Sequence, residues 1–237
     1  MPERHIHILC TRPVNETLAQ KAKQKGITLD VLSFIETEAI QDIEVQQEIE
    51  WASVEQAIVV FTSMNAVESV IGMLDGFVPE WGIYCMGYKT RELVSGYFGE
   101  HAISGTADNA SELADKIIEK EEPEEVIFFC GNQRRTELPR KLRDQGITVN
   151  EIIVYETTAI EHTVDKVYDG VLFFSPSAVE SFFKKNTLPQ QTIVFAIGNT
   201  TSETVHRYCS NKIMISDLPG KDELVEQAME YFSTMDH

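Results

Sequence analysis

The chain has 237 residues, and 20 Lys and Arg residues against 38 Asp and Glu residues give it a formal net charge of −18. Hydrophobic residues make up 43% and charged residues 24%, which is ordinary globular composition and excludes an intrinsically disordered chain. The acidic balance, without any dense Lys/Arg run, argues against a nucleic-acid-binding protein. The sequence also lacks the apolar stretch of about 18 residues that a transmembrane helix needs.

The N-terminal segment and the cysteines favour a cytoplasmic protein. The first residues, MPERHIHILC, hold no apolar run of signal-peptide length and lead directly into a strand-like pattern. Four cysteines, at positions 10, 85, 130 and 209, lie far apart and form no CxxC pair. This usage is typical of reduced thiols in a cytoplasmic protein.

Short apolar runs alternate with amphipathic stretches along the whole chain. The apolar runs predict strands at 6–10, 29–34, 58–61, 83–86, 126–130, 151–155, 171–174, 193–197 and 212–215. The stretches of helical period predict helices at 16–25, 66–74, 91–97, 111–120, 136–145, 178–185, 202–208 and 221–232. Repeated β-α alternation predicts an α/β fold with parallel sheets covered by helices on both faces.

Parts of the chain repeat one another. FTSMNAVESV at 61–70 and FFSPSAVESF at 173–182 share six of ten residues, and YCMGYKT at 84–90 resembles FAIGNTT at 195–201. Cys10, the GIT triplet at 26–28 and the Glu-Thr pair at 36–37 recur at 130, 146–148 and 156–157. We therefore expect two similar lobes built on one βα unit.

The repeats also predict the lobe boundaries. Each GIT triplet runs into a strand and then into a matching tail, IETEA at 35–39 and YETTA at 155–159. Matching tails predict two crossings, so we expect one lobe from residues 1–37 with 159–237 and a second, inserted lobe from 38–158. Two linking strands would form a hinge over a cleft, where ligands preferentially bind.

Four segments rich in Ser, Thr, Asn and Gly follow predicted strands and precede predicted helices, at 62–65, 87–90, 175–177 and 198–201. The carboxyl ends of parallel strands are the usual ligand site in such folds, and backbone N–H groups at helix N-termini suit anions. The alternative is that the Ser and Thr side chains only cap helices. The candidate binding residues here are Ser63, Asn65, Gly87, Ser175, Ser177, Gly198, Asn199 and Thr200.

A fifth segment, GNQRRT at 131–136, follows the predicted strand at 126–130. Gly131 would let a ligand approach the backbone closely, and Asn132, Arg134 and Arg135 add polar groups before a helix predicted to begin near Thr136. The arginines could instead form salt bridges with nearby Glu residues.

Three further residue types could take part in chemistry: tyrosine, cysteine and histidine. Tyr155 follows an aliphatic run at 152–154 and precedes a polar tail, so its hydroxyl could face the cleft, although a packing tyrosine is the alternative. We interpret Cys130 as a structural thiol, because the sequence offers it no base. His5 and His7 share a strand face without other ligands, so we expect no metal site.

Together these motifs resemble the uroporphyrinogen-III synthase family, the cyclising enzymes of tetrapyrrole biosynthesis. The resemblance spans nearly the whole chain, in family order: Thr11-Arg12-Pro13, FTSMNAV (61–67), MGYKT (86–90), FCGNQRRTELPRKLRDQGITVNEIIVYET (129–157), FFSPSAV (173–179) and AIGNTT (196–201). Met64, Arg91 and Ser202 depart from residues common in the family. The resemblance implies two lobes joined by a two-stranded ladder.

The resemblance implies a lyase that needs no cofactor or metal. The family closes linear hydroxymethylbilane into uroporphyrinogen III, with loss of water and inversion of ring D. It implies that Tyr155 assists the departing hydroxyl as proton donor and that Thr90 and Thr201 assist in positioning. Arg12, Arg134 and Arg135 would offset part of the repulsion between an acidic protein and a carboxylate-rich substrate.

Two alternatives remain from the residues alone. One is a non-catalytic two-lobed binding protein, and the other is a regulatory relative that kept the fold and lost the activity. The missing signal peptide and the Thr/Tyr set argue against the first, and no appended DNA-binding segment supports the second. We expect a monomeric cytoplasmic enzyme that acts on hydroxymethylbilane and binds neither nucleic acid nor membrane.

Overall fold

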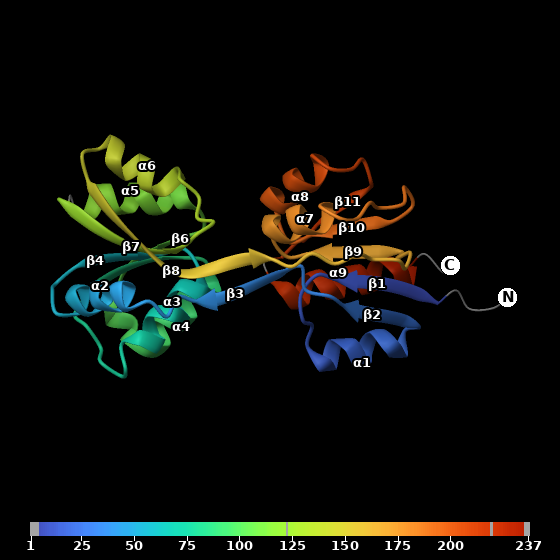
Figure 1. Cartoon of the computed structure of the whole chain (residues 1–237), viewed down its shortest axis with the longest axis horizontal. Helices are drawn as coiled ribbons and strands as arrows, with labels where there is room; N and C mark the ends of the chain where they lie inside the picture. The colour runs from blue at the N-terminus through green and yellow to red at the C-terminus, as the bar shows by residue number, and fades with distance from the viewer. Residues whose placement is uncertain (1–4, 122, 219, 235–237) are drawn as a thin grey trace. The chain divides into compact units, whose positions relative to one another are not determined.

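The computed structural model describes residues 5–121, 123–218 and 220–234, and it confirms the α/β fold (Figure 1). The chain divides into two compact units. The first unit holds the chain up to Glu36 and from Thr158 onward, and the second is the inserted segment Thr37–Thr157. The chain passes between the units within β3 (Ile35–Ala39) and β8 (Thr148–Ala159), which are neighbours in one sheet.

The first unit is built on a five-stranded parallel sheet in the order β11-β10-β9-β1-β2. Its strands are β1 (Ile6–Cys10), β2 (Ile27–Val31), β9 (Gly170–Phe173), β10 (Ile193–Ala196) and β11 (Ile213–Ile215). Helices α1 (Glu16–Gln24) and α9 (Lys221–Thr234) bury apolar side chains against one face. Helices α7 (Pro176–Phe183) and α8 (Asn199–His206) pack on the other face.

The second unit is built on a six-stranded sheet in the order β3-β8-β7-β4-β5-β6. Its remaining strands are β4 (Ile58–Phe61), β5 (Gly82–Met86), β6 (Ile103–Ala107) and β7 (Glu125–Gly131), with a 3₁₀ turn at Glu100–Ala102. Helices α2 (Ile43–Ser53), α3 (Met64–Met73) and α4 (Tyr88–Phe98) cover one face, and α5 (Ala110–Glu121) and α6 (Glu137–Asp144) cover the other (Figure 1).

The two sheets share one topology, but the chain runs through it from different starting points. In the second unit the chain runs from β4 to β5 and β6, then returns to β7 on the other side of β4 and ends at β8. In the first unit it runs from β1 to β2, then returns to β9 on the other side of β1 and continues to β10 and β11. The pair β1-β2 therefore corresponds to β7-β8, which explains why the sequence repeats pair Cys10 with Cys130. Strands β9–β11 correspond to β4–β6.

The structure corrects several predicted elements. Strands β3 and β6 and helix α2 were not predicted from the sequence, and the strand expected at 29–34 lies at Ile27–Val31. The helices predicted to begin at 66, 91, 178 and 202 begin two or three residues earlier. Most residues of the four predicted strand-end loops therefore belong to the first turn of a helix. No helix in the described ranges is long and apolar enough to cross a membrane.

Candidate functional site

A pocket of about 450 Å³ lies in the second unit where the strand order reverses, between the carboxyl ends of β4 and β7. This switch point is where open α/β sheets bind ligands, because the loops that leave the two strands diverge there. Four predicted site residues line the pocket: Ser63, Gly131, Arg134 and Tyr155.

Tyr155 is positioned by an irregularity in the strand pair β7-β8. Cys130 pairs with Ile153, whereas Gly131 pairs with Tyr155, so Val154 is an extra residue on β8. A β-bulge re-aims the side chains beside it. The Tyr155 ring packs against the core of this unit, and its hydroxyl donates a hydrogen bond to Ser63 Oγ at 3.1 Å.

Gly131 makes room for the Tyr155 ring. A Cβ atom at residue 131 would lie 2.4 Å from Cζ and 2.8 Å from the hydroxyl oxygen of Tyr155, which is inside van der Waals contact. The close approach expected at Gly131 is therefore made by a protein side chain. Gly131 acts on the site through Tyr155.

Ser63 connects Tyr155 to a helix N-terminus. It is the N-cap of α3, and its Oγ accepts a hydrogen bond from the Asn65 backbone N–H at 3.2 Å as well as the one from Tyr155. A hydroxyl oxygen has two lone pairs, so Ser63 retains its own O–H for donation to a ligand. Capping and ligand binding are thus compatible at this residue.

Thr90 and Thr201 occupy the same position in the two units, the third residue of α4 and of α8. Their exposed fractions are 5% and 3%. Neither hydroxyl forms a hydrogen bond to another residue in the described parts of the chain, so both keep a donor at a helix N-terminus. The glycines that cap these helices differ: Gly87 has φ of 83°, which favours glycine, whereas Gly198 is extended.

Arg12, Ser175 and Ser177 follow β1 and β9, the strands that flank the switch point of the first unit, whereas Asn199 and Thr200 follow β10. Arg12 is half-buried after the β1 end, where Thr11 Oγ1 donates to the Leu172 carbonyl at 2.8 Å. Ser175 caps α7 by accepting from the Ala178 N–H, and its hydroxyl lies 3.3 Å from that of Ser177. Asn199 and Thr200 form the first turn of α8.

Asn132 is directed toward the backbone of β8. Its Oδ1 accepts from the Thr157 N–H at 3.0 Å and its Nδ2 donates to the Thr157 carbonyl at 3.4 Å. Gln133 Nε2 donates to the same carbonyl at 3.0 Å. The two amides therefore extend the β7-β8 pairing past the end of β7.

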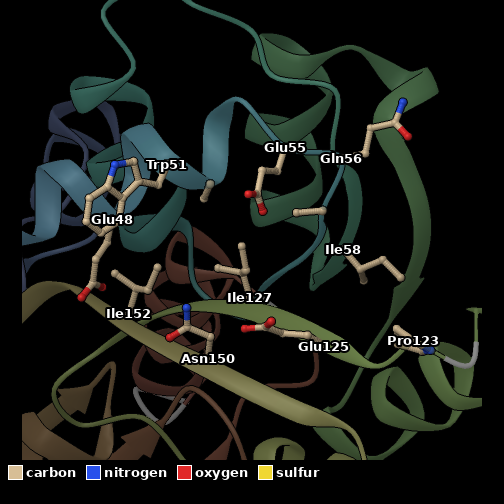
Figure 2. Close-up of a pocket in the computed structure, with 12 residues that line it drawn as sticks. Glu48, Trp51, Glu55, Gln56, Ile58, Pro123, Glu125, Ile127, Asn150 and Ile152 are labelled. Carbon is tan, nitrogen blue, oxygen red and sulfur yellow. The ribbon is translucent and has the colours of Figure 1, made fainter.

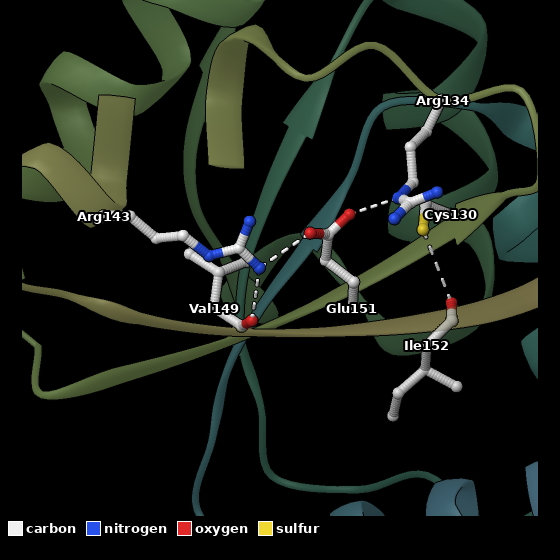
Figure 3. A network of polar contacts seen from close by, with 6 residues as sticks. All are labelled: Cys130, Arg134, Arg143, Val149, Glu151 and Ile152. Atoms are coloured by element: carbon white, nitrogen blue, oxygen red, sulfur yellow. Dashed lines mark hydrogen bonds and ion pairs between the residues drawn. The ribbon is translucent and has the colours of Figure 1, made fainter. Parts of the chain in front are cut away.

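Arg134 and Arg143 both contact the carboxylate of Glu151 (Figure 3). Arg143 donates to Glu151 Oε1 at 2.7 Å and to the Val149 carbonyl at 3.0 Å, and Arg134 donates through Nε to Oε2. Burial alone would raise the pKa of Glu151, but the hydrogen bonds from both arginines bring it below its ordinary value. Two guanidinium groups on one carboxylate leave a net positive charge beside the pocket.

Cys130 behaves as a structural thiol. Burial raises its pKa to about 12, and its Sγ contacts the Ile152 carbonyl at 3.7 Å (Figure 3). A thiol with this pKa is protonated near neutral pH and is a poor nucleophile. Burial likewise raises the pKa of Cys10, its counterpart in the first unit, to about 12.

Asp108 and Asn109 line the pocket although the sequence did not point to them. They follow β6, whose sequence ISGTA lacks the apolar run on which strands were predicted. A prediction of β6 would have placed both residues at the carboxyl end of a strand. In the described residues, no three His, Cys, Asp or Glu side chains gather into a metal-binding group.

Two doubly wound α/β units with polar helix N-termini at their switch points define a class of ligand-binding α/β proteins. The sequence identifies the family within that class, because residues 16–226 match the family model described as uroporphyrinogen-III synthase HemD. The chain belongs to the uroporphyrinogen-III synthase family.

The sequence identity to an individual curated relative is below 30%. A uroporphyrinogen-III synthase of Saccharomyces cerevisiae is 28% identical over 173 residues, which are 61% of this chain and 62% of that protein. The match thus spans less than two thirds of this curated relative.

Solved structures share the fold. A mutant uroporphyrinogen III synthase from Thermus thermophilus superposes with a TM-score of 0.67 at 11% identity, covering 98% of this chain and 100% of that one. A uroporphyrinogen-III synthetase from Helicobacter pylori gives a TM-score of 0.64 at 17% identity, covering 95% and 99%. At these identities the likeness concerns the fold alone.

Proposed function

We propose that the protein is a lyase that cyclises hydroxymethylbilane to uroporphyrinogen III, with loss of water and inversion of ring D. The observation that carries the proposal is the family match over residues 16–226. The reaction needs help for the departing hydroxyl, stabilisation of the cation that remains, and exclusion of water.

Tyr155 is our candidate for the group that assists the departing hydroxyl. Its O–H donates to Ser63 Oγ at 3.1 Å on the wall of the switch-point pocket. The phenol has one proton, so the O–H would turn from Ser63 to the departing hydroxyl, directly or through a water. Thr90 and Thr201, each with an unused hydroxyl, would position the substrate.

The carboxylates of the substrate would bind to backbone N–H groups, hydroxyls and guanidinium groups of both units. Helix N-termini favour anions, and the net charge of −18 makes such local donors necessary. Gly131 and Asn132 would shape the site through Tyr155 and Thr157. The proposed binding set is Arg12, Ser63, Asn65, Gly87, Gly131, Asn132, Arg134, Ser175, Ser177, Gly198, Asn199 and Thr200.

The protein would work as a monomer in the cytoplasm, without a cofactor and without binding nucleic acid. All four cysteines are free in the structure, which is compatible with a reducing compartment. Light scattering on the purified protein measures the oligomeric state.

The decisive experiment is an assay with purified protein and hydroxymethylbilane that separates the type III product from the type I isomer, which forms spontaneously. We expect the type III isomer to dominate. Accumulation of type I alone, at the uncatalysed rate, would favour the non-catalytic binding or regulatory alternative.

A further inference from the structure

Helix α2 belongs to the second unit and has no counterpart between the corresponding strands of the first. Its inner side packs Val45, Ile49 and Ala52 against the core. Its outer side exposes Ile43, Trp51 and Val54, which are 72%, 69% and 78% exposed. Their spacing along the helix places these three side chains on one face, which we name the α2 face. Apolar side chains gathered on an exposed face mark interaction sites.

A pocket of about 400 Å³ adjoins the α2 face (Figure 2). It lies at the amino ends of β4 and β7, the opposite end of the sheet from the candidate active site. Trp51 forms part of its wall, and Ile58, Ile127 and Ile152 supply apolar surface from the strands.

Three carboxylates surround this pocket: Glu48 and Glu55 from α2, and Glu125 from β7 (Figure 2). None of the three side chains forms an ion pair or hydrogen bond with a described residue. This differs from Glu151, whose charge is offset by two arginines. The α2 pocket thus combines unneutralised negative charge, an indole ring and aliphatic surface.

This combination is complementary to lysine and arginine side chains. Their aliphatic stems pack on apolar surface while the cationic head pairs with carboxylates, and an exposed indole adds cation–π attraction. A second copy of this chain is disfavoured as occupant, because a symmetric contact would bring the same carboxylates together. A small cation would fill the pocket but would leave Ile43 and Val54 uncovered.

We propose that the α2 face and its pocket form a docking surface for a segment of another protein that presents a lysine or arginine side chain beside apolar residues. The proposal is independent of the cyclisation reaction, since none of these residues belongs to the proposed active site.

The experiment uses the two tryptophans as reporters. Trp81 is 3% exposed and its Nε1 donates to the Ala52 carbonyl of α2 at 2.8 Å, so its signal reports whether the helix itself moves. The backbone amide signals of α7 and α8 in the first unit serve as the internal control. The probe is a short amphipathic peptide with lysines on one face and leucines on the other, added to ¹⁵N-labelled protein. We expect a saturable shift of the Trp51 indole N–H signal, larger than any shift of Trp81, while the amide signals of α7 and α8 stay in place.

Variants test where the peptide binds. The triple variant Glu48→Gln, Glu55→Gln, Glu125→Gln should weaken peptide binding by about tenfold or more. A matched variant on the first unit, Glu180→Gln, Glu203→Gln, Glu230→Gln, changes the net charge equally and should bind the peptide like the wild type. Val54→Ser should also weaken binding, and the pocket variant should cyclise hydroxymethylbilane at the wild-type rate.

Several results would overturn the proposal. Equal weakening by both triple variants would mean that only the net charge attracts the peptide. Failure of the peptide to shift Trp51 would remove the docking surface altogether. Equally tight binding of N-acetyl-lysine amide, without any effect of Val54→Ser, would show a small-cation pocket instead.

Discussion

At the scale of single residues, removing the hydroxyl of Tyr155 tests its role in catalysis while the packing of its ring is kept. We expect Tyr155→Phe to lower kcat by about 10²-fold, the low end for positioned acid help, because in the proposed substrate the leaving group departs easily from an electron-rich pyrrole. KM and Tm should stay near wild type, since the ring remains. Steady-state kinetics measures this, with Tyr97→Phe as control, because Tyr97 donates to the Phe77 carbonyl on another part of the unit. Full kcat in Tyr155→Phe would make the tyrosine structural.

Gly131 offers a second test of the same hydroxyl. Gly131→Ala would place a Cβ atom 2.4 Å from Tyr155 Cζ and 2.8 Å from its hydroxyl oxygen, so the ring must shift and its hydrogen bond to Ser63 is disturbed. We expect a loss of kcat about as large as that of Tyr155→Phe. The double variant should lose little more than either single variant, because both changes remove one interaction. Additive losses in this double-mutant cycle would show that Gly131 acts independently of the tyrosine hydroxyl.

The contribution of Glu151 to the free energy of unfolding should depend on pH. Its pKa is lowered in the folded protein, so its contribution to stability is present above its ordinary value of about 4.5 and is lost as the pH falls through the lower folded value. The free energy of unfolding of wild type should therefore exceed that of Glu151→Gln at neutral pH, and the gap should narrow on acidification. Urea unfolding across a pH series checks this. A difference in the free energy of unfolding that stays constant into the acid range would contradict a lowered pKa of Glu151 in the folded protein.

At the scale of elements, the caps of α3 and α7 combine two roles. Ser63→Ala and Ser175→Ala should each lower the free energy of unfolding by about 1 kcal/mol through loss of the cap. Each should also weaken product binding by about 1–3 kcal/mol if the hydroxyl donates to a carboxylate. Asn15→Ala, which removes the cap of α1, is the matched control and should affect stability alone. Calorimetric titration measures product binding, and unchanged affinity in both serine variants would limit them to capping.

Strands and helices with a continuous buried apolar pattern could be predicted from the sequence, whereas three segments with many exposed or part-buried side chains could not. β3 and β6 are the two edge strands of the six-stranded sheet, and their sequences IETEA and ISGTA carry no apolar run, since most of their side chains are only partly buried or exposed. In α2 the exposed Ile43, Trp51 and Val54 obscure the inward stripe of Val45 and Ile49. The apolar pattern on which predictions rest is weak in all three segments.

The candidate site could be predicted in part, for a similar reason. Ser63 and Arg134 follow parallel strands, and Tyr155 ends the strand predicted at 151–155, so their meeting at one edge of the sheet could be expected. The contacts of Asn132 with Thr157 and of Arg134 with Glu151 depend on the register of β7 against β8, including the bulge at Val154. No local pattern in the sequence specifies that register.

At the scale of the whole molecule, the charge of −18 would oppose the approach of the carboxylate-rich substrate that we propose. Moderate salt should therefore lower KM, because charges are screened beyond about 10 Å at 0.1 M ionic strength, while contacts inside the site are affected less. Kinetics over a potassium chloride series tests this, with an uncharged osmolyte as control. A KM that rises steadily from the lowest salt would indicate net attraction instead.

The second unit begins and ends at Thr37 and Thr157, whose hydroxyl oxygens lie 3.4 Å apart. For the first unit, an insertion whose two ends lie side by side acts as a closed loop. The entropic cost of closing a loop grows only slowly with its length. The first unit could therefore have acquired the second unit as one insertion, which we call the cassette, without rearranging its own strands. The same geometry would let evolution, or a protein engineer, exchange the cassette for another folded module with adjacent termini.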